Sequence, residues 1–265
     1  MAATGVDSPG RAQIGASTLR KDAWWLQPLL TFLALTAFVV YSAWRVFMNK
    51  YYYSSPYVSL FYSPCLVTTC AEGAEPGGPI GSWWALSPSL IIAWIPLTFR
   101  FSCYYYRKAY YRSFWLSPPA CAVSEPHGKY TGERRLPLIL NNVHRYTFYL
   151  ALLLNVMLTY DAVMAFRNYD GTWAHVGVGT VILTANAVCL WFYTLSCHSC
   201  RNTVGGRITH FSKHPVRYKF WTFVSRINEH HMKWAWISLC TVVLADFYVY
   251  SLASGLLSTD PHISF

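Results

Sequence analysis

The sequence predicts an all-α membrane protein, a bundle of five transmembrane helices with the N-terminus in the cytoplasm and the C-terminus outside. Of its 265 residues, 54% are hydrophobic and 12% are charged, which is about half the charged share of a typical soluble domain. The apolar residues stand in long blocks and not in short periodic stripes, as expected of segments that cross a membrane. Basic residues gather in alternate loops, and this indicates the orientation of the bundle.

Both ends of the chain are predicted to lie outside this bundle. Residues 1–23 are polar and include Gly, Ser and Thr, without the apolar segment and small-residue cleavage site of a secretory signal. We expect a short disordered cytoplasmic tail there. The five-helix domain is expected over 24–258, and a short outer tail over 259–265.

Five apolar segments reach the length of about 20 residues that a helix needs to cross the hydrocarbon core. Trp and Tyr border them, as they do at membrane–water interfaces. The second segment contains Pro88 and Pro96, which predicts a kink there. The predicted spans are 25–47, 83–106, 138–165, 176–198 and 233–256.

The loops after the second and fourth spans carry most of the basic residues. By the positive-inside rule these loops lie in the cytoplasm, so we expect a multi-pass plasma-membrane protein with a basic cytoplasmic face. The net charge of +10 follows from these loops, and no nucleic-acid-binding motif accompanies it. The basic residues are Arg107, Lys108, Arg112, Lys129, Arg134 and Arg135 in one loop, and Arg201, Arg207, Lys213, Arg217, Lys219 and Arg226 in the other.

This orientation divides the eight cysteines into groups with different expected chemistry. Cys65 and Cys70 fall in the first outer loop, where the environment is oxidising, and we expect a disulfide between them. Structural disulfides are not expected at the cytoplasmic ends of the spans. The cysteines at those ends are Cys103, Cys121, Cys197 and Cys200.

Histidines occupy the same membrane depth as these four cysteines. His144 opens the third span, His198 ends the fourth, and His231 opens the fifth. A single interfacial histidine is ordinarily a polar anchor, but Cys and His at the ends of four helices predict a metal or redox centre.

The fourth span offers one face to such a centre. Tyr193, Cys197 and Cys200 lie within about 40° of Asn186 around a helix, and the buried amide turns that face into the bundle. Cys197 and Cys200 would then reach one metal from adjacent turns. The spacing leaves three centres open: zinc, a [2Fe–2S] cluster with mixed Cys and His ligands, and a haem between His144 and His198 or His231.

Two groups of side chains are candidates for binding a quinone, which needs hydrogen-bond donors for its carbonyls and a source of protons. The cytoplasmic group is Tyr104, Arg107, His214, Arg217 and Trp221. Contact with lipid headgroups is the alternative for these residues. The outer group, for a quinone site or a proton route, is Tyr160, Asp161, Asp246 and Tyr248. Carboxylates inside a membrane are usually functional, and pairing with a neighbouring helix is the alternative.

Seven stretches of the chain together resemble the membrane anchor of actinobacterial succinate dehydrogenase 1. They are "FYSPC", "CYYYRKAYYRSFW", "CAVSEPH", "LPLILNNVHRY", "YTLSCHSCR", "HFSKHPVRY" and "ADFY". The resemblance implies a five-helix anchor that docks a flavoprotein and an iron–sulfur subunit and passes electrons from succinate to menaquinone. It also implies a haem-free anchor with a Rieske-like [2Fe–2S] cluster, and a chain that is catalytic only within the complex.

The residues that we expect to hold this cluster are Cys197, Cys200, His144 and His231, with Cys103, Cys121 and His198 as alternates. Two Cys on one iron and two His on the other raise the potential above that of an all-Cys cluster. The alternatives are a haem b-binding anchor of another quinone-linked dehydrogenase and a non-redox membrane protein with a structural zinc. A higher oligomer of the complex is compatible with the sequence.

Overall fold

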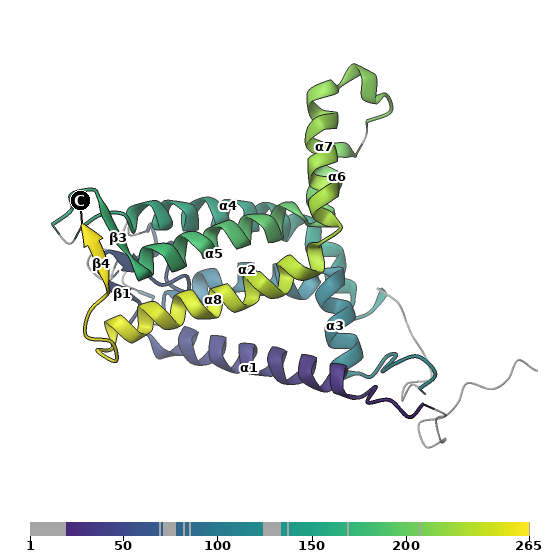
Figure 1. Cartoon of the computed structure of the whole chain (residues 1–265), viewed down its shortest axis with the longest axis horizontal. Coiled ribbons are helices and arrows are strands. Elements are labelled where there is room, and N and C mark those ends of the chain that lie inside the picture. The colour runs from purple at the N-terminus through teal and green to yellow at the C-terminus, as the bar shows by residue number, and fades with distance from the viewer. Residues whose placement is uncertain are drawn as a thin grey trace, which may run out of the picture.

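The computed structural model describes residues 20–68, 70, 78–81, 83–84, 86–123, 134–136, 138–168, 170–206 and 208–264. Most of the predicted cytoplasmic tail, 1–19, lies outside these residues. Five helices lie side by side and alternate in direction (Figure 1). They are α1 (Leu26–Met48), α2 (Ser89–Ser102), α4 (His144–Met164), α5 (Val178–Leu195) and α8 (His231–Ala253).

Four of the helices in the described part of the chain are long and apolar enough to cross a membrane, namely α1, α5, α8 and the helical segment Ile139–Met164 that contains α4. The remaining bundle helix, α2, is apolar but has 14 residues. At 1.5 Å per residue it is about 21 Å long, which is shorter than the hydrocarbon core of about 30 Å. The helical membrane fold predicted from the sequence is therefore confirmed with four candidate spans among the described residues, and the helix found in the second predicted span is shorter than predicted.

The predicted span 83–106 was wrong at both ends. Pro88 is the N-cap of α2, so it precedes the helix and does not kink it. At the other end Cys103 has an extended backbone (φ −67°, ψ 127°), and the short helix α3 (Tyr104–Phe114) begins directly after it. Pro96 lies inside α2.

The predicted span 176–198 was also too long, because α5 ends at Leu195. Cys197 is extended (φ −66°, ψ 143°), and its sulfur accepts a hydrogen bond from the backbone N–H of Ser199, which makes it the N-cap of α6 (His198–Gly205). This cap ends one helix and starts another. Cys197 and Cys200 therefore do not continue the face of α5 that carries Tyr193, and the expectation of one shared helical face was wrong.

Two ends of the bundle can be distinguished. At the cavity end, α2, α4, α5 and α8 meet around the largest cluster of buried apolar side chains. From this end α6 and α7 (Pro215–Asn228) leave the bundle and lie crosswise to its long helices (Figure 1). Two short 3₁₀ helices, Leu138–Val143 and Phe211–Lys213, precede α4 and α7.

The opposite end, which we call the strand end, carries two small antiparallel sheets. Strand β1 (Tyr53–Ser54) pairs with β2 (Tyr57–Val58), and β3 (His175–Gly177) pairs with β4 (His262–Ser264). The segment predicted as an outer tail thus folds back onto the bundle over its described part.

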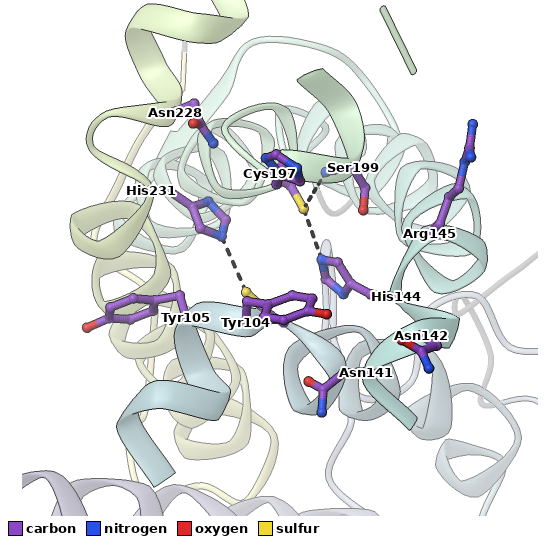
Figure 2. Close-up of a pocket in the computed structure, with 12 residues that line it drawn as sticks. Tyr104, Tyr105, Asn141, Asn142, His144, Arg145, Cys197, Ser199, Asn228 and His231 are labelled. Atoms are coloured by element: carbon purple, nitrogen blue, oxygen red, sulfur yellow. Dashed lines mark hydrogen bonds between the residues drawn. The ribbon is translucent and has the colours of Figure 1, made fainter. Parts of the chain in front are cut away.

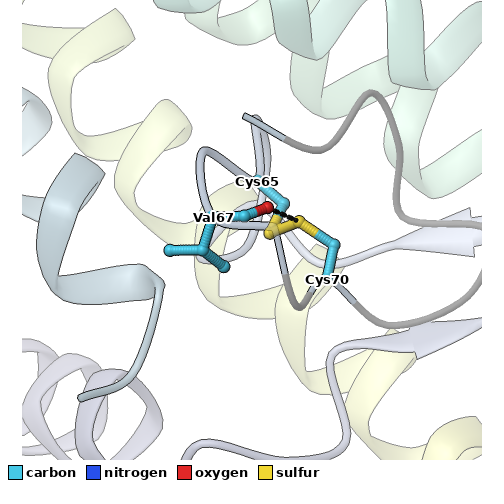
Figure 3. Close-up of a disulfide and its surroundings, with 3 residues drawn as sticks. All are labelled: Cys65, Val67 and Cys70. Atoms are coloured by element: carbon cyan, nitrogen blue, oxygen red, sulfur yellow. Dashed lines mark hydrogen bonds between the residues drawn. A yellow bond between two sulfur atoms is a disulfide. The ribbon is translucent and has the colours of Figure 1, made fainter. Parts of the chain in front are cut away.

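The loop between α1 and α2, at the strand end, contains a disulfide between Cys65 and Cys70 (Figure 3). This is the pairing that the sequence led us to expect. Both cysteines pack in a cluster with Tyr52, Tyr62 and Val67, so the disulfide lies in a small apolar core of its own.

Asp260 fastens the C-terminal segment to the strand end. Its carboxylate accepts hydrogen bonds from the hydroxyl of Tyr57 (2.6 Å) and the backbone N–H of Gly179 (3.1 Å). The Tyr57 hydroxyl also lies 2.8 Å from Nε2 of His175. A Cβ at Gly177 would stand 1.8 Å from the Asp260 carboxylate, so the approach of the two segments requires glycine there.

We expect the Tyr57→Phe variant to lose about 1–3 kcal/mol of stability, because it leaves buried partners of the hydroxyl unsatisfied. The thermal unfolding midpoint of the assembled complex measures this loss. Tyr53→Phe, a partly buried tyrosine of the same loop, is the matched control. Equal midpoints for the two variants would show that the hydrogen bond from Tyr57 to Asp260 does not contribute to the stability of the complex.

Candidate functional site

A cavity of about 280 Å³ lies at the cavity end, where four bundle helices begin or end (Figure 2). Its polar side chains come from segments far apart in the sequence, so it exists only in the folded bundle. The cavity is lined by Cys103, Tyr104, Tyr105, Asn141, Asn142, His144, Arg145, Cys197, His198, Ser199, Asn228 and His231.

Two buried cysteines reach the cavity from equivalent positions. Cys103 stands between α2 and α3, and Cys197 between α5 and α6, each with an extended backbone. Their exposed fractions are 3% and 1%. An extended residue between two helices turns its side chain off the helical path, and here both turns place a sulfur at the end of the bundle.

Two histidines face these sulfurs. His144 and His231 are the first residues of α4 and α8. The Nε2 atom of His144 lies 3.0 Å from the sulfur of Cys197, and the Nε2 atom of His231 lies 3.4 Å from the sulfur of Cys103 (Figure 2). The site therefore consists of two thiol–imidazole pairs.

A serine precedes each cysteine and holds the histidine of the opposite pair. The hydroxyl oxygen of Ser102 lies 3.0 Å from Nδ1 of His144, and the other ring nitrogen of His144 faces Cys197. The hydroxyl oxygen of Ser196 lies 2.7 Å from Nδ1 of His231, and the other ring nitrogen of His231 faces Cys103. Each Ser–Cys dipeptide thus contacts both histidines, one through its serine and the other through its cysteine, and each imidazole presents Nε2 to a sulfur. A hydrogen bond to one ring nitrogen fixes the orientation of the ring and the role of the other nitrogen.

Aromatic rings restrict both imidazoles further. Phe99 stacks on His144 with 4.9 Å between ring centres and an interplanar angle of 4°. Tyr193 stacks on His231 at 5.2 Å and 11°. Each imidazole is therefore held by a stacked ring, a serine and a thiol, so the positions of the donors are set before anything binds.

The surroundings of the sulfurs are apolar. Burial raises the pKa of the Cys197 thiol to about 12 and that of Cys200, in α6, to about 11. Both are protonated thiols at neutral pH, because burial disfavours the charged thiolate. A metal that binds Cys197 must therefore displace a proton.

The two thiol–imidazole pairs of the cavity offer two Cys and two His side chains as possible ligands. Among the described residues, no group of three or more His, Cys, Asp and Glu side chains could hold one metal ion, whereas structural zinc takes four such ligands. Two Cys and two His are the ligand types of a Rieske-type [2Fe–2S] cluster, which divides them between two irons. The cavity of about 280 Å³ lies just below the range of about 300–1,000 Å³ that is usual for small-molecule sites.

The structure places the expected ligands differently from the sequence. Cys197, His144 and His231 line the cavity, and so does the alternate Cys103. Cys200 is buried in α6 but does not line the cavity, and Cys121 is an exposed cysteine whose carbonyl accepts a hydrogen bond from Arg20. The geometry therefore brings Cys103 to the position expected for Cys200. The alternate His198 also lines the cavity.

The five cytoplasmic quinone candidates are not brought together. Tyr104 lines the cavity, and the guanidinium of Arg107 lies 5.4 Å from the centre of its ring. Arg217 donates to the carbonyls of Val204 and Gly206 and so joins α7 to α6. His214 and Trp221 belong to the same region, at the start of α7 and within it, and do not line the cavity.

Two of the outer candidates are engaged in structural bonds. Asp246 is fully buried and forms an ion pair with Arg45 of α1, with 2.7 Å from Nε to Oδ2 and 3.1 Å from Nη2 to Oδ1. Tyr41 and Ser59 also donate hydrogen bonds to it. The hydroxyl of Tyr248 donates to Asp260.

The other two outer candidates lie near the end of α4. Tyr160 is exposed, and Asp161 is half-buried. The Oδ2 atom of Asp161 has no hydrogen-bond partner among the described residues. Of the two acids predicted for a proton route, Asp161 is therefore the one that forms no ion pair with another described residue.

Sequence reasoning missed the residues that orient the histidines. Ser102 and Ser196 were not candidates, and neither was Asn228, which donates to the carbonyl of Ser196 (2.6 Å). The dipeptide Ser–Cys occurs at both positions, in "FSC" and "LSC", but it also occurs in "HSC" (Ser199–Cys200), whose cysteine does not line the cavity, so it is a weak signal.

Fold and site together define a helical membrane protein with a paired thiol–imidazole cavity at one end of its bundle. Residues 26–255 match the family model described as actinobacterial succinate dehydrogenase subunit SdhC. The chain belongs to this family, so it is the membrane-anchor subunit of a succinate dehydrogenase complex, and the resemblance noted in the sequence is confirmed.

A solved structure supports the assignment. A chain of the Mycobacterium smegmatis Sdh1 complex in the apo form is 52% identical, and the alignment covers 99% of this chain and 100% of that chain with a TM-score of 0.87. No curated protein sequence matches.

Proposed function

We propose that this anchor docks a flavoprotein and an iron–sulfur subunit, holds a Rieske-like [2Fe–2S] centre in the cavity, and delivers electrons from succinate to menaquinone. The observation that carries the proposal is the crossed arrangement of two Ser–Cys dipeptides and two histidines. The chain supplies the quinone-reducing part of the enzyme and is not catalytic alone.

The proposed topology has five spans, with the N-terminus and the cavity end in the cytoplasm. The five bundle helices alternate in direction, and α2 is proposed as the second crossing. The basic loops follow α2 and α5, at the cavity end, which is the cytoplasmic side by the positive-inside rule. The soluble subunits then meet the membrane next to the cavity.

Cys103, Cys197, His144 and His231 would hold the cluster. Histidine ligation would give it a higher potential than an all-cysteine cluster has. Ser102 and Ser196 keep Nε2 of each imidazole directed at the cavity, and Phe99 and Tyr193 cover the rings. These four residues keep the donors in place and limit the access of water to the sulfurs.

Menaquinone is proposed to bind near Tyr104 and Arg107, at the cytoplasmic side of the cavity. Tyr104 is 52% exposed, and its hydroxyl and the guanidinium of Arg107 are hydrogen-bond donors suited to a quinone carbonyl. The neighbouring Asn142 and Arg145 also line the cavity and add donors to this polar side.

The centre is tested by low-temperature EPR on the purified complex, reduced first with succinate and then with dithionite, together with an optical spectrum. A Rieske-like signal without haem bands supports the proposal. Haem bands without such a signal would show that the complex holds haem and not the proposed cluster, with the histidines as candidate axial ligands. If neither appears, the cavity holds no redox group and the proposal fails.

Ser196→Ala is expected to lower cluster occupancy about 10- to 100-fold, as the loss of groups that orient metal ligands does. The cause is the loss of the hydrogen bond that holds His231. Iron and labile sulfide content measure occupancy, and the midpoint potential of any remaining cluster should shift. Ser113→Ala, in α3, whose hydroxyl bonds to its own helix, is the control. Full occupancy with an unchanged potential would show that Ser196 does not position the ligand.

Asp161 lies toward the opposite end of α4 from His144 and does not line the cavity, so its proposed role is in the outer proton route and not at the quinone site near Tyr104. Asp161→Asn is expected to lower menaquinone reduction about tenfold, because an amide cannot pass on a proton. Succinate oxidation with a soluble dye should be unaffected. Asp170→Asn, an exposed acid bonded to Thr172, is the control. Full menaquinone reductase activity in Asp161→Asn would exclude this acid from the proton route.

A further inference from the structure

The helices α6 and α7 form an arm, residues 198–229, that is not used by the proposed electron-transfer site. The arm leaves the bundle at the cavity end and lies crosswise to the long helices (Figure 1). Because the long helices cross the membrane, an element that lies across their ends runs along the membrane surface.

One face of α7 is occupied by α6. Val224 is fully buried, and Arg217 donates to two carbonyls of the α6 segment. The indole of Trp221 lies so close to Gly205 that a Cβ there would stand 2.0 Å from it. These contacts fix α7 against α6, so the two helices act as one rigid arm.

The other face of α7 presents an apolar stripe. Val216, Phe220 and Phe223 are 81%, 45% and 47% exposed. Spacings of four and three residues place them within about 60° of one another around the helix. The rings of Phe220 and Phe223 are stacked, with 6.4 Å between their centres. A continuous exposed apolar face of this kind on a rigid helix marks a binding surface.

Cations border this stripe. Lys219 and Arg226 are exposed and lie on the same side of it, roughly 70–90° from its centre by helical geometry. Glu229 is the only acidic residue in the sequence of the arm. An apolar stripe bordered by Lys and Arg is typical of helices that lie in the interface of an anionic membrane. The alkyl chains of Lys and Arg follow the apolar surface while their charged groups reach the phosphates.

We propose that the α6–α7 arm is a binding surface for anionic phospholipids. The stripe of Val216, Phe220 and Phe223 enters the boundary between headgroups and acyl chains, and Lys219 and Arg226 bind the phosphates. The strongly basic charge of the arm and its direction across the bundle favour lipid over a soluble protein as the occupant.

The test uses the assembled complex in vesicles of phosphatidylglycerol and phosphatidylcholine, with the photoreactive residue benzoylphenylalanine at position 220. Tyr218 is the matched control position, because it is also an exposed aromatic residue (42%) but points about 160° away on the same helix. We expect phospholipid adducts from position 220 and few from position 218. Adducts to another subunit or to a second copy of the chain, or no adducts, would overturn the proposal.

The charge requirement is tested in the same vesicles. Lys219→Gln and Arg226→Gln should each lower the ratio of phosphatidylglycerol to phosphatidylcholine adducts about fivefold, the equivalent of about 1 kcal/mol per cation near an anionic surface. Lys50→Gln, at the strand end of α1, should leave the ratio unchanged. An unchanged ratio in both arm variants would overturn the preference for anionic lipid.

Discussion

Cys103→Ser is expected to remove the [2Fe–2S] signal of the complex and to abolish menaquinone reduction, whereas Cys200→Ser should leave both in place. The reason is geometric, because Cys103 lines the cavity opposite His231 and Cys200 does not line it. Both cysteines are 3% exposed, so the two variants make the same atomic change at equally buried positions and differ only in their place relative to the cavity.

The measurements are EPR, the iron and labile sulfide content, and two activities of the purified complex. Reduction of a soluble dye by succinate reports the flavoprotein and iron–sulfur subunits and should survive in both variants. Reduction of a menaquinone analogue should fall about 100-fold or more in Cys103→Ser, in keeping with the loss of a metal ligand or its support. The opposite result, a signal lost only in Cys200→Ser, would restore the ligand set expected from the sequence and contradict the geometry.

Asp246→Ala is expected to destabilise the chain by about 3–5 kcal/mol, the usual effect of removing one partner of a buried ion pair. The variant leaves the guanidinium of Arg45, which is fully buried, without its carboxylate. Hydrogen bonds from Tyr41 and Ser59 to Asp246 are lost at the same time. These bonds join α1, α8 and the loop between α1 and α2, so the loss should reduce the amount of assembled complex.

The thermal midpoint and the yield of complex measure this effect. The double variant Arg45→Met, Asp246→Leu is the informative control, because it removes the pair without leaving a buried charge and should be clearly more stable than Asp246→Ala. If the double variant is as unstable as the single one, the instability comes from packing and not from the unpaired guanidinium. Normal stability of Asp246→Ala would contradict the structural role of the pair.

Much of the fold follows from local properties of the chain. The apolar spans are visible because a membrane helix needs a long uninterrupted apolar run, and the predicted spans 25–47 and 233–256 agree closely with α1 and α8. Helix ends were less predictable. Cys103 and Cys197 lie inside runs that the sequence predicts as continuous helix, but each has an extended backbone that separates two helices.

The helix ends decided the composition of the site. On a continuous helix Cys197 and Cys200 would share a face, so the sequence favoured them as a pair. The break at Cys197 turns its sulfur toward His144, and the break at Cys103 turns a second sulfur toward His231. A sequence read one segment at a time cannot show this pairing, because each thiol meets an imidazole from a different helix.

The sequence alone determined that this is a helical membrane protein of the succinate dehydrogenase anchor type, with Cys and His gathered at one depth. Composition and motifs carry that information, because they reflect the solvent and the chemistry that each segment meets. Only the tertiary structure decided that Cys103 and not Cys200 faces the cavity, that Ser102 and Ser196 hold the imidazoles, and that Asp246 belongs to an ion pair. These are contacts between residues far apart in the chain, and their geometry exists only once the helices have packed.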